Sequence, residues 1–76
     1  MNAQRRKAIT KSIGVLKEQQ EIIEALMEEE QEYLDNIPEN LEGSSRYEKA
    51  EEAIQDLEGA NDLLEDALDY LESATE

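Results

Sequence analysis

Pairs of glutamates three residues apart are the feature of this sequence whose residue type and spacing could support catalysis. The pairs are Glu21/Glu24, Glu29/Glu32 and Glu48/Glu51. An i, i+3 pair lies on one face of a helix, and carboxylate oxygens are ligands that Mg²⁺ prefers. Such pairs would suit a small acidic metal-dependent nucleotide hydrolase. However, 21 of the 76 residues are acidic, so these spacings arise by chance, and we interpret the carboxylates as solvated helix faces.

Nucleophilic and acid–base catalysis lacks its usual side chains in this chain. The sequence contains no cysteine and no histidine, which removes thiolate ligands, disulfides and the side chain that titrates near neutral pH. The segment "DNIPEN", residues 35–40, lacks the alternating oxygen ligands of a calcium-binding EF-hand loop. We therefore predict a non-enzymatic protein with no catalytic residue, no cofactor and no bound metal.

Charge is divided unevenly along the chain, whose net charge is −14. Residues 1–17 contain five basic side chains and no acid, whereas residues 18–76 contain all 21 acids against Arg46 and Lys49. Such a surface repels nucleic acid and anionic membranes and attracts basic proteins. No apolar run approaches the roughly 20 residues of a membrane span, and a polar segment follows Arg5–Lys7 where a signal peptide would have its apolar core. We expect a soluble protein that binds neither nucleic acid nor membranes directly.

The apolar residues predict two long amphipathic helices, at about residues 3–36 and 45–74. These residues alternate three and four positions apart, which is the spacing of a coiled-coil seam. The first seam is Ile9, Ile13, Leu16, Gln20, Ile23, Met27, Glu30, Leu34 and Ile37. The second seam is Tyr47, Ala50, Ile54, Leu57, Asn61, Leu64, Leu68 and Leu71. The predicted fold class is all-α, a single domain over residues 1–76 that forms an antiparallel two-helix coiled-coil hairpin.

The segment between the helices, about residues 37–44, predicts a turn. Pro38 cannot continue a helix, and Gly43 gives the backbone the freedom to reverse. Ser45 followed by Glu48 fits a capping box at the start of the second helix, with Ser44 as the competing cap.

A fold-back about residues 40 and 41 pairs the two seams in one register. The position numbers of paired residues then sum to 80 or 81 along the whole hairpin, as for Met27 with Ile54. Gln20 and Asn61 fall in the same layer, where we expect their amides to hydrogen-bond and to penalise shifted registers. The basic start of the first helix then lies beside the acidic end of the second. We expect Glu30 to extend to water or to pair with a neighbouring base, and not to form a site.

A second apolar stripe beside each seam predicts that each helix has two neighbours. We expect these residues to form the interface of a homodimeric four-helix bundle. They are Val15, Ile22, Leu26, Tyr33, Ala53, Ala60, Leu63, Ala67 and Tyr70. The tyrosines of the chain, Tyr33, Tyr47 and Tyr70, are interpreted as core residues. The alternative is a monomer that keeps this stripe for a helix of another protein.

Acids of both helices are the residues that we expect to bind a partner with a basic surface. They are Glu21, Glu24, Glu28, Asp56, Asp62, Glu65, Asp66 and Asp69. Helices of about 33 residues extend about 50 Å, a length over which duplex DNA carries roughly 30 phosphates. A dimer would carry twice −14, or −28. This density would allow the protein to compete with nucleic acid for a DNA-binding protein, and the alternative is that the acids only keep a coiled coil soluble.

The sequence resembles small acidic helical proteins that recur in phages and prophages of Firmicutes. The resemblance covers nearly the whole chain and depends on the opening "RRKAITKSI", the turn "EEEQEYLDNIPENLEGSSRYEKAEE" and the closing helix rich in Ala, Ile, Leu and Glu. Tyr47 departs from the pattern, where a glycine is expected. The resemblance implies a phage-borne accessory role in the cytoplasm of an infected or lysogenic bacterial host, and it transfers no site residue.

The predicted function is therefore that of a non-enzymatic phage accessory protein. It would bind and inhibit a host or defence protein by acidic mimicry of nucleic acid, in the manner of an anti-CRISPR protein. The first alternative is a structural coiled-coil component of a phage particle or scaffold. The remaining alternative is the small acidic metal-dependent nucleotide hydrolase.

Overall fold

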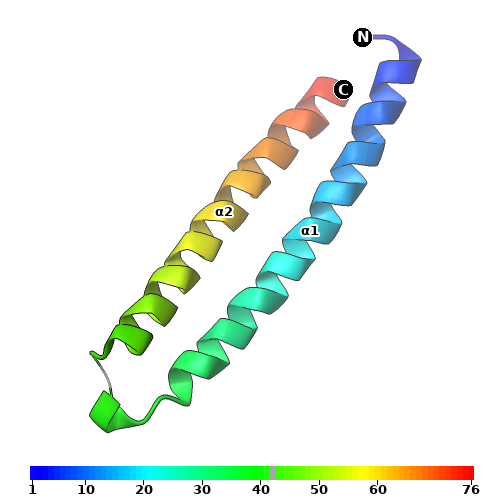
Figure 1. The fold of residues 1–76 in the computed structure, drawn as a ribbon. Helices are drawn as coiled ribbons and strands as arrows, with labels where there is room; N and C mark the ends of the chain where they lie inside the picture. Colours follow the sequence, from blue (N-terminus) through cyan, green and yellow to red (C-terminus); the bar gives the residue numbers. More distant parts are fainter. Residues whose placement is uncertain (42) are drawn as a thin grey trace.

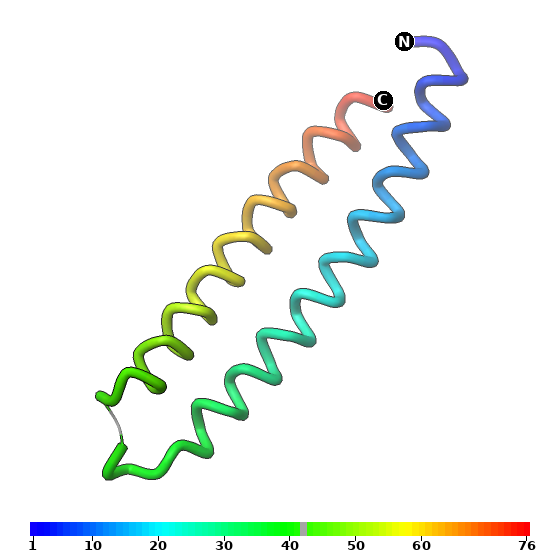
Figure 2. The backbone as a smooth tube through the Cα atoms, viewed as in Figure 1, coloured from blue at the N-terminus to red at the C-terminus, as the bar shows by residue number. Residues whose placement is uncertain are grey.

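The computed structural model describes residues 1–41 and 43–76 and contains two long helices that run antiparallel (Figure 1). Helix α1 spans Ala3–Asp35, a short 3₁₀ helix η1 spans Glu39–Leu41, and helix α2 spans Ser45–Thr75. The predicted all-α helical hairpin is confirmed. The molecule measures 60 × 15 × 13 Å, and both termini lie at the end opposite the turn (Figure 2).

Each helix begins at a side-chain cap. The Asn2 side-chain oxygen accepts a hydrogen bond from the Arg5 amide at 2.7 Å, and the Ser44 hydroxyl accepts one from the Tyr47 amide at 3.3 Å. The capping box predicted at Ser45 is wrong by one residue, because Ser45 is already helical. Gly43 adopts φ = +81°, and Ser44 follows it in the extended conformation that an N-cap requires. Ser44, the competing cap of the sequence, is therefore the N-cap of α2.

The end of α1 matches the expected turn. The Asn36 and Ile37 amides still donate to the Glu32 and Leu34 carbonyls. Pro38 has no N–H with which to continue this pattern. The predicted helix ranges differ from α1 and α2 by one residue at the end of each helix, a difference within the usual fraying of helix termini.

The core is the seam between α1 and α2. Every residue of the two predicted seams is buried or half-buried, and the most buried are Ile37, Ala50 and Leu68. Ala50 and Leu68 are only 2% and 3% exposed. The heptad spacing thus identified the residues by which one helix contacts the other.

The polar layer of the seam differs from the prediction. Gln20 and Asn61 are both half-buried, but the Gln20 amide donates to the Glu65 carboxylate at 2.6 Å. The Asn61 side-chain oxygen is buried and has no hydrogen-bond partner among the described residues. A carboxylate is a stronger acceptor than an amide oxygen, and Glu65 lies one helical turn from Asn61. The Gln20 amide, which was expected to pair with Asn61, therefore donates to Glu65.

Candidate functional site

The carboxylates of the described residues lie almost entirely in solvent. Nineteen of the twenty described Asp and Glu side chains are exposed, and Glu30 is half-buried. The remaining acid, Glu42, lies outside the described residues. The acids are therefore available for contact with a partner over the full length of both helices.

Four of the eight acids predicted to bind a partner line one shallow groove between the helices. They are Glu21, Glu24, Glu65 and Asp69. The groove is completed by Lys17, Gln20, Leu68 and Glu72. Because it carries five carboxylates and a single basic side chain, this groove is the part of the surface where negative charge from both helices converges.

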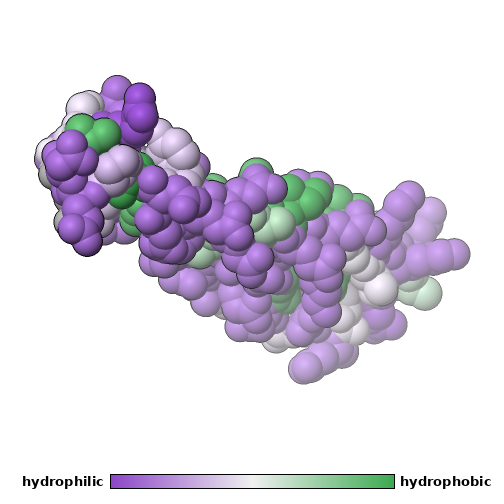
Figure 3. Space-filling model, turned by 90° about the horizontal axis from the view of Figure 1, so that it is seen from below, coloured by the Kyte–Doolittle hydropathy of each residue, from purple (hydrophilic) through white to green (hydrophobic). Residues whose placement is uncertain are grey.

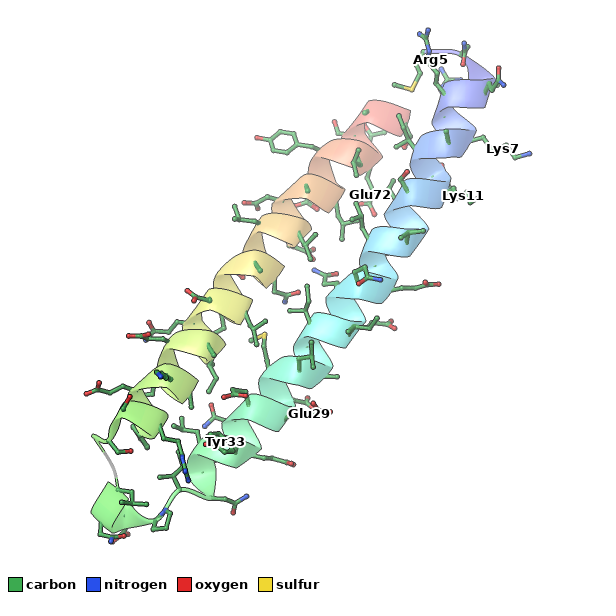
Figure 4. All side chains as sticks on the ribbon, viewed as in Figure 1. Arg5, Lys7, Lys11, Glu29, Tyr33 and Glu72 are labelled. Atoms are coloured by element: carbon green, nitrogen blue, oxygen red, sulfur yellow. The ribbon has the colours of Figure 1, made fainter. Side chains whose placement is uncertain are left out.

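The groove also contains the polar contacts between the helices that the structure records. Lys17 forms an ion pair with Glu72 at 3.2 Å, and Gln20 donates to Glu65. Figure 4 shows Glu72 on the side of α2 that faces α1, at the end of the hairpin that also holds Lys7 and Lys11. The basic start of α1 therefore does lie beside the acidic end of α2, as expected. Both side chains of the ion pair are about half exposed, so its contribution to stability is small, about 0.5 kcal/mol.

Position relative to the seam separates the hairpin into two flanks. Six of the eight predicted acids directly follow a seam residue in the sequence: Glu21, Glu24, Glu28, Asp62, Glu65 and Asp69. In an antiparallel pair, residues with the same position relative to the seam lie on the same side of both helices. Glu65 and Glu72 contact Gln20 and Lys17 of α1, so this side of the hairpin is the one that contains the groove. We call these six residues the acidic flank; Asp56 and Asp66 lie outside it.

The predicted acid set missed part of this surface. Glu51, Glu58, Glu65 and Glu72 recur every seven residues, and each directly follows a seam residue. Glu51 and Glu58 line a second hollow on the same side of the hairpin, together with Gln31. The seven-residue recurrence was present in the sequence and would have identified this row.

The stripe predicted as a dimer interface forms the opposite flank. All nine of its residues directly precede a seam residue, and we call them the apolar flank. Both helices contribute to this side of the hairpin. Tyr33 of α1 lines one hollow with Arg46 and Lys49 of α2, which also directly precede seam residues. Figure 3 shows apolar patches between hydrophilic side chains on the surface.

Many side chains of the apolar flank are exposed in the single chain. Val15 and Ile22 are each 50% exposed, and Leu63 is 71% exposed. The prediction that all tyrosines are core residues is wrong for this chain alone. Tyr70 is 80% exposed and Tyr33 is 44% exposed, whereas Tyr47 is half-buried in the seam. The hairpin seam is too narrow to cover residues that lie one position outside it.

Glu30 is a half-buried seam residue in the half of the hairpin that contains the turn. It lines a hollow with Tyr33, Arg46, Lys49 and Ala50, and Figure 4 shows Tyr33 at this end of α1. The expected basic neighbours are therefore present. Lys17–Glu72 is nevertheless the only ion pair within 4.0 Å in the described part of the chain, so Glu30 forms no ion pair with either base.

The described residues were searched for a cluster of metal ligands and for a helix that could span a membrane. Within residues 1–41 and 43–76, no three carboxylates converge in the way that a metal ion requires. No helix among these residues combines the length and apolar character that a membrane span needs.

Comparison of the chain with protein-family models, curated proteins and solved structures finds no significant match.

Proposed function

We propose that this chain is a non-enzymatic accessory protein of phage origin that binds and inhibits a host or defence protein. The acidic flank would occupy the basic surface with which that protein contacts nucleic acid. The observation that carries the proposal is the convergence of carboxylates from both helices along one side of a narrow rod.

The charge and dimensions of the rod support this proposal. A DNA duplex 60 Å long carries about 35 phosphates. The chain carries −14 and two copies carry −28 over a rod 60 Å long. The linear charge density of a dimer is therefore close to that of DNA, and a basic groove that fits a duplex would attract it.

The separation of the two flanks supports the proposal as well. The apolar flank lies on the side opposite the acidic flank, so a second copy could pack against it without covering the carboxylates. A homodimeric four-helix bundle would then present two acidic flanks on its outer surfaces. Self-association and partner binding would not compete for the same residues.

Capture from a lysate of the bacterial host tests the proposal. We expect the immobilised protein to retain a basic nucleic-acid-binding protein at low salt and to release it at high salt, because salt screens contacts between exposed charges. Failure to retain any basic protein at low salt would contradict the proposal.

A structural coiled-coil component of a phage particle or scaffold is the second candidate. The exposed apolar flank favours it, since Val15 and Tyr70 lie near one end of the rod and Tyr33 lies near the other. A flank of this length would allow assembly beyond a dimer. Mass that grows with protein concentration, or association with purified particles, would support this role in place of inhibition.

A further inference from the structure

The single chain exposes more surface than a compact protein of its size. Its accessible surface is 5846 Å², whereas a globular chain of 8.7 kDa exposes about 4,700 Å². The excess of about 1,100 Å² is comparable to the roughly 800 Å² that each partner buries in a stable interface. The apolar flank supplies side chains for such an interface. An interface of this area, formed by the same flank of two chains, would suit a second copy of this chain.

Two arrangements of a symmetric dimer would bury the apolar flanks. In one, the two-fold axis runs along the hairpin, and both turns lie at the same end. In the other, the axis is perpendicular to the hairpin, and the turns lie at opposite ends. Both arrangements keep neighbouring helices antiparallel, so the helix dipoles do not distinguish them. The distribution of charge along the rod does.

Charge is concentrated in the half of the hairpin that contains the turn. Residues 21–60 carry fourteen acids and two bases, a net charge of −12. Residues 1–20 and 61–76 form the half with the termini and carry seven acids and five bases, a net charge of −2. Turns at the same end would place two charges of −12 side by side. Turns at opposite ends would place each −12 half beside a −2 half, which lowers the repulsion.

We propose that two copies associate through the apolar flank with their turns at opposite ends. This orientation rests on the self-association proposed above and is independent of the target of the acidic flank. The basic N-terminal segment of each copy, which contains Arg5, Lys7 and Lys11, then lies beside the acidic turn half of the other copy. The two −12 halves are kept apart, and the basic N-terminal segments are brought beside acidic side chains.

The spacing of the apolar flank fits this symmetry. An isologous antiparallel contact between two copies of α1 pairs residues whose position numbers have a constant sum. Val15 with Tyr33 and Ile22 with Leu26 both sum to 48, so each of these four α1 side chains meets another at the same level. The two-fold axis then passes near residue 24. At that level of the hairpin, Ala53 and Ala60 of the two α2 helices face each other, and their small side chains allow close approach.

A distance between two spin labels tests the orientation. The chain has no cysteine, so Asn40→Cys in the exposed 3₁₀ helix gives one labelling site per copy. Turns at opposite ends put the two labels about 50 Å apart, because each lies about 16 residues from the axis at 1.5 Å per residue. Turns at the same end put them within about 25 Å, because neighbouring helices pack 8–10 Å apart.

Two charge substitutions serve as matched controls for the labelled protein. Ala60→Glu places a carboxylate in the apolar flank and should abolish the distance of about 50 Å. Ala25→Glu adds the same charge at an exposed position outside both flanks and should preserve it. A dimer with the short distance would overturn the orientation. A protein that is monomeric by light scattering would overturn self-association, while capture of a basic protein would still test the acidic flank separately.

Discussion

At the scale of single residues, the polar layer of the seam is the least satisfied part of the structure. The Asn61 side-chain oxygen is buried without a hydrogen-bond partner among the described residues. Leaving such a group unsatisfied costs about 1–3 kcal/mol. We therefore expect Asn61→Leu to raise the free energy of unfolding by about that amount, measured by thermal unfolding at fixed protein concentration.

Gln20→Leu is the matched control for this substitution. Gln20 has an acceptor in Glu65, so its replacement also removes a hydrogen bond and should stabilise the protein less than Asn61→Leu does. The double substitution should raise the melting temperature further while it weakens the preference for one register. Loss of stability in Asn61→Leu would mean that this amide contributes a favourable interaction in solution.

The start of α2 offers a second test at this scale. The Ser44 hydroxyl accepts the hydrogen bond from the Tyr47 amide, so Ser44→Ala should destabilise the protein by about 1 kcal/mol. Ser45→Ala changes the adjacent serine, which is exposed and already helical, and should change stability by less than about 0.5 kcal/mol. Thermal unfolding followed by circular dichroism measures both variants. Equal losses, or a larger loss in Ser45→Ala, would contradict the assigned cap.

At the scale of the helices, the sequence was sufficient to predict the hairpin and the residues that form its seam. Alternating three and four spacing can be satisfied only by a continuous helical seam, and Pro38 with Gly43 marks the turn. The choice between Ser44 and Ser45 depended on which serine adopts the extended backbone angles of a cap, and the residue types alone do not determine this. The partner of Gln20 depended on side-chain rotamers that heptad spacing does not specify.

The two flanks were only partly evident from the sequence. The apolar stripe was identified because its residues are chemically distinct from their neighbours. The acidic flank was not separated from the other acids, because carboxylates occur on every exposed face of both helices. Only the contacts of Lys17 and Gln20 with α2 showed on which side charge from the two helices converges.

Oligomeric mass tests the function of the apolar flank at this scale. We expect the unaltered protein to have twice the mass of the 8.7 kDa chain, and Ala60→Glu to have the mass of one chain, because a buried carboxylate without a partner is costly. Light scattering at matched concentrations measures this. Ala25→Glu should remain dimeric. If Ala60→Glu kept the full mass, Ala60 would not lie in the interface.

At the scale of the whole molecule, salt should act in opposite directions on the two flanks. Two copies of a −14 chain repel each other, and salt screens this repulsion over about 10 Å at 0.1 M. The dimer should therefore become tighter as salt increases, whereas binding of a basic protein should become weaker. Sedimentation and binding measurements over one salt series check both trends. A dimer that dissociates as salt rises would contradict association through an apolar flank.

Neutralising part of the acidic flank separates local charge from total charge. The flank variant is Glu21→Gln, Glu24→Gln and Asp69→Asn. The control variant is Glu18→Gln, Glu32→Gln and Glu52→Gln, whose positions are exposed and outside the flank. Each variant removes three charges. At about 0.5 kcal/mol per contact, the flank variant should bind the captured basic protein about tenfold more weakly. The control should bind within about threefold of the unaltered protein; equal losses would mean that only net charge matters.

Competition with duplex DNA tests most directly whether the acidic flank occupies a nucleic-acid-binding surface. The basic protein captured at low salt is challenged with increasing concentrations of duplex DNA at constant ionic strength, and the fraction released is measured. If the acidic flank and DNA bind the same surface, DNA should release the captured protein completely, and the flank variant should require less DNA than the control variant. A captured protein that binds DNA while it remains on the acidic flank would contradict nucleic-acid mimicry.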